Sequence, residues 1–212
     1  MVPIVTVRTP LGDRSMDLFS SLLSQNIVFI SGVIDDETAN LVSAQLLFLE
    51  GEDPDKDISL YINSPGGSVT SALAIYDTMQ FVNADVSTTC IGEAGNVSAV
   101  LIAAGTKGKR FALPNARLLI AQPSLEEVGG QATDVAIQAK EIVRLRSHLS
   151  AILSRHTEQT MERIERDIER DLILNPTQAL EYGLIDCILQ PRINTEESPA
   201  KPATGRSHRR HV

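Results

Sequence analysis

The chain has 212 residues and a formal net charge of −8, with 42% hydrophobic, 22% charged and 4% aromatic residues. This composition is typical of a globular domain, and its acidic balance argues against nucleic acid as the main partner. No apolar run is long enough to cross a membrane, and the first residues carry charges where a secretory signal needs an apolar core. Cys90 and Cys187 fall in predicted strands, so we expect small buried side chains rather than a disulfide or metal pair. We therefore expect a cytoplasmic protein with no cofactor and no metal.

Apolar patterns predict strands and helices that alternate along the chain. The predicted strands are 27–30, 58–62, 86–91, 110–113, 117–121 and 184–189. The predicted helices are 68–82, 97–104, 134–155 and 158–169, one from Asp35 or Asp36 to Gly51, and a short one capped by Asn175 that ends at Gly183. Such alternation implies right-handed βαβ crossovers, and hence an α/β fold with a largely parallel sheet.

The two ends of the chain differ in character from its centre. Residues 1–20 mix prolines, glycine and charges, so we expect a mobile arm that ends in a short amphipathic turn at 16–23. Residues 191–212 contain three prolines and a basic end, which predicts a disordered tail. The chain is thus divided into an arm at 1–20, one globular domain at 21–190 and a tail at 191–212.

The stretch from Val86 to Gly105 reads as a strand, a tight turn and a small apolar helix. Gly92 and Gly95 are expected to form the turn, and Asn96 to cap the helix. Many hydrolases present a nucleophile on this layout, because the sharp turn exposes one side chain together with a backbone N–H group. The amide of Asn96 is neither a nucleophile nor a base. The stretch therefore looks like an acyl-transfer site without its reactive atom.

Five segments carry long and specific motifs: Tyr61–Phe81, residues 86–105, Lys107–Pro123, Gly130–Asp134 and Ala179–Asp186. They closely resemble the ClpP family, the proteolytic subunits of the ATP-dependent Clp protease, and the resemblance covers about residues 1–190. It implies a crotonase-like α/β fold of layered, mostly parallel sheets with flanking helices. It also implies two stacked heptameric rings (a tetradecamer) around a chamber, a AAA+ unfoldase on the outer face, and N-terminal arms that line the axial pore.

The resemblance also indicates what is missing. In the family the turn reads Gly-x-Ala-x-Ser-Met-Gly, and Asn96 stands at the position of the serine nucleophile. The general base of the family lies in a His-Gln-Pro triplet, and here Ala121 takes the place of that histidine. The acid of an Arg-Asp dipeptide is kept as Asp171, but it has no imidazole to orient. The chain is thus similar to the ClpR-type paralogues, which lack the catalytic serine and histidine.

Peptide binding is expected to survive this loss. The backbone N–H groups of Gly67 and Val97 match the oxyanion-hole positions of the family. A substitute nucleophile is not expected at Ser98, because side chains two residues apart on a helix point in nearly opposite directions. His148 and His156 lie on the predicted long helix, where we expect surface or interface residues rather than a relocated base. The cleft is therefore expected to bind a peptide without cutting it.

The resemblance assigns two contact surfaces. The unfoldase-docking pocket is expected at Ser59, Tyr61, Phe81, Thr89, Phe111, Leu113 and Leu189. Ser59 and Thr89 are more polar than the family's usual residues, which predicts either weaker docking or neutral drift. The ring-to-ring contact is expected in the loop and helix at 122–156, with Glu126, Glu127 and Gln131, and also at Arg170 further along the chain. Copies of the two glutamates would repel each other across a two-fold contact, which favours a different subunit as neighbour unless both simply face water.

The sequence thus predicts a non-catalytic subunit that assembles into mixed heptameric rings with an active ClpP paralogue and modulates its proteolysis. Three alternatives remain open. The chain could be an active serine endopeptidase with a rearranged site, a homo-oligomeric scaffold or binding protein, or an acyl-CoA enzyme of the wider crotonase-like group.

Overall fold

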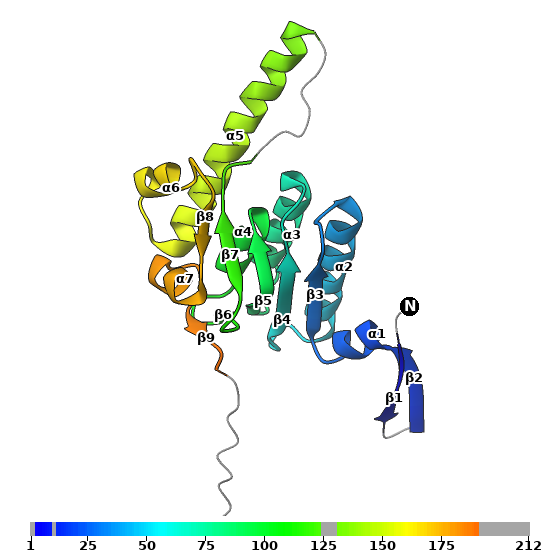
Figure 1. Ribbon diagram of the computed structural model, residues 1–212. Helices are drawn as coiled ribbons and strands as arrows, with labels where there is room; N and C mark the ends of the chain where they lie inside the picture. Colours follow the sequence, from blue (N-terminus) through cyan, green and yellow to red (C-terminus); the bar gives the residue numbers. More distant parts are fainter. Residues whose placement is uncertain (1–2, 10–11, 124–130, 191–212) are drawn as a thin grey trace, which may run out of the picture.

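The computed structural model describes residues 3–9, 12–123 and 131–190. Figure 1 shows a central sheet with helices packed against it, a hairpin beyond one end of the sheet, and the long helix α5 (Ala132–Thr157) extending away from the body. Within the described ranges, no helix combines the length and the apolar character needed to span a bilayer.

The central sheet has seven strands, and most of its pairings are parallel. The strands are β3 (Ile27–Ser31), β4 (Ile58–Ser64), β5 (Val86–Gly95), β6 (Arg110–Ala112), β7 (Arg117–Ile120), β8 (Leu172–Leu174) and β9 (Cys187–Ile188). The order β3-β4-β5-β6-β9 is parallel throughout. The far end of β5 pairs in parallel with β7, and β7 pairs with β8 in the antiparallel direction. The expected α/β fold with a mostly parallel sheet is confirmed.

The remaining helices connect and cover these strands. They are α1 (Leu18–Leu23), α2 (Asp36–Glu52), α3 (Val69–Phe81), α4 (Val97–Ala103), α6 (Met161–Asp167) and α7 (Pro176–Tyr182). All seven residues of α4 are buried, so this small apolar helix lies at the centre of the core. The start of α7 has the predicted capping box between Asn175 and Gln178, and α7 ends at Gly183 as predicted.

Several boundaries differ from the prediction. The expected turn at Gly92 is wrong, because β5 continues to Gly95 where Glu93–Gly95 pairs with β7. The short strand β8 was not predicted, since its three residues have no alternating pattern. The strand expected at 184–189 is reduced to β9, and α2 continues past Gly51 to Glu52. These differences arise because pairing partners and packing, rather than local sequence, decide where an element ends.

The start of the chain contains a hairpin that the sequence did not predict. Strands β1 (Ile4–Thr9) and β2 (Gly12–Asp17) pair in the antiparallel direction. Asp17 then caps α1, which begins two residues after the predicted start of the turn at 16–23. The expectation for the cysteines is half wrong, because Cys90 is buried whereas Cys187, on the short strand β9, is exposed. Residues 191–212, where a disordered tail is expected, lie outside the described residues.

Candidate functional site

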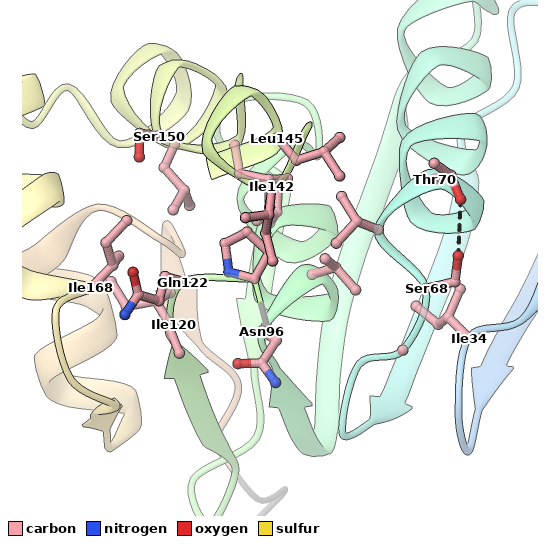
Figure 2. A pocket seen from close by; sticks show the side chains of 18 of the residues that line it. Ile34, Ser68, Thr70, Asn96, Ile120, Gln122, Ile142, Leu145, Ser150 and Ile168 are labelled. Atoms are coloured by element: carbon pink, nitrogen blue, oxygen red, sulfur yellow. Dashed lines mark hydrogen bonds between the residues drawn. The ribbon is translucent and has the colours of Figure 1, made fainter. Parts of the chain in front are cut away.

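A pocket of about 740 Å³ lies beside the turn that joins β5 to α4. Figure 2 shows Ile142 and Leu145 of α5 on one side of this pocket and the turn that carries Asn96 on the other. The lining residues come from the segment after β3, the loop before α3, the start of α4, the segment after β7, and the body of α5 with Ile168. The pocket is therefore assembled from distant parts of the sequence.

The turn at Asn96 is sharp and strained. Asn96 has φ 50° and ψ −114°, a combination that costs a residue with a side chain about 1–3 kcal/mol. Its backbone N–H donates to the carbonyl of Leu119, 2.8 Å away. Gly95 lies so close to the preceding loop that a Cβ atom would sit 2.3 Å from the carbonyl oxygen of Pro65. Asn96 occupies the N-cap position of α4 as predicted, but its side chain makes no capping hydrogen bond and lies exposed at the pocket.

The structure places two of the three expected triad positions at the pocket. Asn96 and Ala121 both line the pocket. Strands β7 and β8 pair Ile120 with Leu172, and Ala121 and Asp171 are the next residues beyond this end of the antiparallel ladder. Asp171 is exposed and lies outside the lining itself. The pocket wall thus presents the amide of Asn96 and the methyl group of Ala121, and the carboxylate of Asp171 lies outside the lining.

Two backbone N–H groups expected to act as oxyanion donors belong to residues that line the pocket. A parallel bridge joins Ile34 to Gly67: Ile34 N–H donates to Gly66 at 2.8 Å, and Ser68 N–H donates to Ile34 at 2.8 Å. This pattern turns the Gly67 N–H away from Ile34. Only glycine fits at position 67, because a Cβ would lie 2.2 Å from the Ile34 oxygen and φ is 151°. Val97 is the first residue of α4, so its N–H has no acceptor within the helix.

Ser98 lies in the interior rather than at the pocket. It has 0% exposure, and its hydroxyl donates to the hydroxyl of Ser64 at 2.9 Å. Ser64 Oγ in turn accepts the Gly66 N–H at 3.1 Å. Ser98 therefore ties the start of α4 to the loop that carries Gly67. Its hydroxyl is already hydrogen-bonded inside the protein, and a substrate in the pocket cannot reach it.

The two helical histidines lie away from the pocket lining. His148 is exposed on α5. His156 is half-buried, with Nε2 3.1 Å from the hydroxyl of Tyr76. Burial, and then the charge of Arg110, lowers the pKa of His156 below its ordinary value. The pocket lining as described contains neither histidine nor cysteine.

Carboxylates give the pocket a negative rim. Asp35 accepts the Thr38 N–H at 2.8 Å as the cap of α2, and this hydrogen bond lowers the pKa of Asp35. Asp36 accepts a hydrogen bond from Ser71, and Glu141 is paired with Arg144 along α5. No lysine or arginine is found among the described lining residues. This charge disfavours a ligand that ends in a free carboxylate.

The pocket also contains a residue that the sequence did not indicate. Ser150 of α5 is fully buried, and its hydroxyl has no hydrogen-bond partner in the described part of the chain. A serine within a long amphipathic helix gives no sequence signal of what its hydroxyl contacts. Only the packing of α5 over the turn reveals it.

Some of the expected docking residues are neighbours in the sheet. The register aligns Tyr61, Thr89 and Phe111 on three adjacent strands, with Phe29 stacked on Tyr61 at a ring-centroid distance of 5.3 Å. Thr89 is buried whereas its neighbours in this row are half-buried. The other positions lie near the row or on other elements. Ser59 lies on β4, two residues before Tyr61, and Leu113 directly follows β6. The backbone N–H of Leu189 donates to the carbonyl of Ala112. Phe81 lies at the end of α3 and is 77% exposed.

The expected ring-contact residues are only partly described. Glu126 and Glu127 lie outside the described residues. Gln131 is exposed immediately before α5, and Arg170 is exposed between α6 and β8. The first half of α5 projects from the body (Figure 1), and Ile137 and Val143 are 65% and 61% exposed on it.

The parallel sheet, the buried helix α4 and the strained turn above a pocket define an α/β protein with a hydrolase-type turn. Comparison with known families matches residues 10–192 to the Clp protease family, and the chain belongs to this family. The continuous match leaves the alternative of an acyl-CoA enzyme without support.

Proposed function

We propose that this chain is a non-catalytic subunit of a Clp protease complex. It joins mixed heptameric rings with an active ClpP paralogue, and it modulates the proteolysis of the assembly. The observation that carries this proposal is the strained turn beside an intact pocket, which presents the amide of Asn96 where the family has a nucleophile, with Ala121 in place of the base. The chain keeps the strained backbone conformation at Asn96 although it lacks the serine and histidine that this turn positions in a catalytic site.

The missing groups account for a large loss of rate. A serine hydroxyl attacks a carbonyl only when a base accepts its proton, and neither group is provided at Asn96 and Ala121. Loss of such triad members lowers kcat by about 10⁶-fold and leaves only the contribution of oxyanion donors and binding. The N–H groups of Gly67 and Val97 are suited to hold a peptide carbonyl. The chain therefore retains peptides in the chamber wall without cutting them.

Assembly is supported by the surface of α5. Its N-terminal half, which projects from the body in Figure 1, carries exposed apolar side chains, among them Ile137 and Val143. Such a surface is stabilised by burial against a partner. Mixed rather than uniform rings follow from the expected repulsion between copies of Glu126 and Glu127 across the two-fold contact. The row of Tyr61, Thr89 and Phe111 supports an AAA+ Clp unfoldase as the second partner.

A rearranged active site has less support. Ser98 is buried and bonded to Ser64, and Ser150 lies in a wall whose described lining lacks histidine. A homo-oligomeric scaffold or binding protein would assemble only with itself and would ignore both the unfoldase and the active paralogue. The two are separated by mixing the chain with an active paralogue.

The proposal is tested by peptide hydrolysis with four samples. The chain alone is expected to be silent, and its addition to an active ClpP is expected to change the rate. The double variant Asn96→Ser/Ala121→His is expected to gain activity, whereas the matched single variant Asn96→Ser, which still lacks a base, stays near the background rate. Hydrolysis by the unmodified chain, abolished by a serine-directed phosphonate, would overturn the proposal.

A further inference from the structure

The turn at Asn96 holds its side chain and the next backbone nitrogen in an unusual relation. Around the bond from Cα to the carbonyl carbon, the backbone nitrogen and the Cβ of a residue are about 120° apart. The ψ of −114° at Asn96 therefore brings the nitrogen of Val97 almost into line with the Asn96 Cβ. In a helix or a strand, ψ turns these two atoms well out of line. At Asn96 they lie on the same side of the bond.

This relation is the one that closure of a five-membered ring requires. The ring would contain the Val97 nitrogen and the carbonyl carbon, Cα, Cβ and Cγ of Asn96, and such an imide is close to planar. The backbone is held in this shape from both sides, because the Asn96 N–H donates to Leu119 at 2.8 Å and the Asn96 carbonyl accepts from Ala99 at 3.1 Å. An unfolded chain visits this strained conformation rarely. Folding therefore favours ring closure at this position.

The two groups that would react are both available. Asn96 is exposed, and its side chain makes no capping hydrogen bond (Figure 2). The N–H of Val97 has no acceptor within α4, because Val97 is the first residue of that helix. Both residues line the pocket, so solvent reaches the Asn96 amide from the pocket.

We propose that Asn96 is a site of spontaneous deamidation, which converts its amide to a carboxylate through a cyclic imide formed with Val97. The Val97 nitrogen gives its proton to hydroxide and bonds to Cγ of Asn96. The bond from Cγ to Nδ2 breaks, and this nitrogen leaves as ammonia with a proton taken from water. Water then opens the imide. Opening at Cγ gives aspartate, whereas opening at the main-chain carbonyl carbon gives isoaspartate.

The product alters the pocket that carries the proposed function. A carboxylate at position 96 adds a negative charge to a wall whose rim already contains Asp35 and Asp36. Like charges that share a site repel each other, so the modified chain is expected to hold acidic peptides less well. The inference itself stands on the geometry of the turn and does not depend on what the pocket binds.

The experiment follows two asparagines of the purified full chain, kept folded or unfolded in guanidinium chloride at one pH and temperature. Peptide mass spectrometry measures the conversion of amide to acid, and an isoaspartate-specific methyltransferase detects the second product. Asn83 is the matched internal control. Its Nδ2 donates to Glu50 at 2.6 Å and the Ala84 N–H donates to the same carboxylate at 3.1 Å, so both reacting groups are engaged in the folded chain.

We expect Asn96 to react about ten-fold faster in the folded than in the unfolded chain, a factor that matches the cost of its backbone conformation. Asn83 should react more slowly when folded. It should outpace Asn96 once the chain unfolds, because the β-branched Val97 hinders attack more than Ala84 does. Asn96→Gln keeps an amide but would need a six-membered ring, and should stay unmodified.

Three results would overturn the proposal. They are an Asn96 that reacts no faster in the folded than in the unfolded chain, an Asn96 no faster than Asn83 in the folded chain, and acid formation in Asn96→Gln at the rate of the unmodified chain.

Discussion

The hydroxyl of Ser98 donates a hydrogen bond to the hydroxyl of Ser64 at 2.9 Å, and both residues are fully buried close to the strained turn at Asn96. The motif that this turn resembles has glycine at the position of Ser98, and glycine offers no hydroxyl to Ser64. It joins the first turn of α4 to the loop that carries Gly67. The pocket geometry thus depends on a contact that has no part in the chemistry of an active member.

We expect Ser98→Gly to destabilise the chain by about 2 kcal/mol, and Ser98→Ala by about 1 kcal/mol. Both substitutions remove the hydrogen bond to Ser64, and glycine adds the cost of a flexible residue inside a helix. The free energy of unfolding in urea, at fixed protein concentration, measures both effects. If Ser98→Gly is as stable as the unmodified chain, the bond to Ser64 has no supporting role.

Asp171 is expected to regain a catalytic role when its partners are restored. In the Asn96→Ser/Ala121→His background, Asp171→Asn should lower kcat by about 10⁴-fold, because the restored imidazole loses the carboxylate that fixes its tautomer. Steady-state peptide hydrolysis measures this effect. Glu169→Gln is the matched control, since Glu169 is a nearby exposed acid paired with Arg146. Equal effects of the two substitutions would show that Asp171 does not reach the restored histidine.

A buried ion pair between Arg110 and Asp186 is expected to contribute to the pH dependence of stability. Arg110 is 4% exposed, and its Nε and Nη2 donate to Asp186 at 2.8 and 2.5 Å. Burial acts to raise the pKa of Asp186, but the hydrogen bonds and charge of Arg110 outweigh it and hold the pKa below its ordinary value of 3.8. This contribution is present above the ordinary pKa, and is lost as the pH falls through the lowered one.

We therefore expect the free energy of unfolding to decrease below about pH 4. At pH 7, Asp186→Asn should cost about 3–5 kcal/mol, because the Arg110 charge is left buried without its counter-ion. Asp57→Asn serves as the control, since Asp57 pairs with Lys109 on the surface. Urea titrations between pH 3 and pH 7 measure both effects. A cost for Asp186→Asn no larger than that for Asp57→Asn would contradict the role of the pair.

The two cysteines should differ in reactivity. Burial raises the pKa of the Cys90 thiol to about 11, so almost none of the reactive thiolate is present at pH 8. Cys187 is exposed at the edge of the sheet. Treatment of the native protein with iodoacetamide should therefore modify Cys187 and leave Cys90 intact, as judged by peptide mass spectrometry. Comparable modification of both would mean that the strand bearing Cys90 opens readily.

The sequence predicts the fold well where a pattern is local. The alternation of strands and helices, the capping box at Asn175 and the end of α7 at Gly183 all follow from short motifs. The length of β5 and the existence of β8 do not, because they depend on pairing between segments far apart in the chain. The same holds for the site. Asn96 and Ala121 are visible as departures from a motif, whereas the free hydroxyl of Ser150 arises only from the packing of α5 over the turn.

The central claim is that this chain shares a ring with an active paralogue, and native mass spectrometry of the two proteins after co-expression tests it most directly. We predict complexes whose masses require both subunits within one assembly. The variant Ile137→Glu, which places a charge on the exposed apolar surface of α5, should reduce their abundance. Separate homo-oligomers of each protein, with no mass that contains both, would contradict the claim.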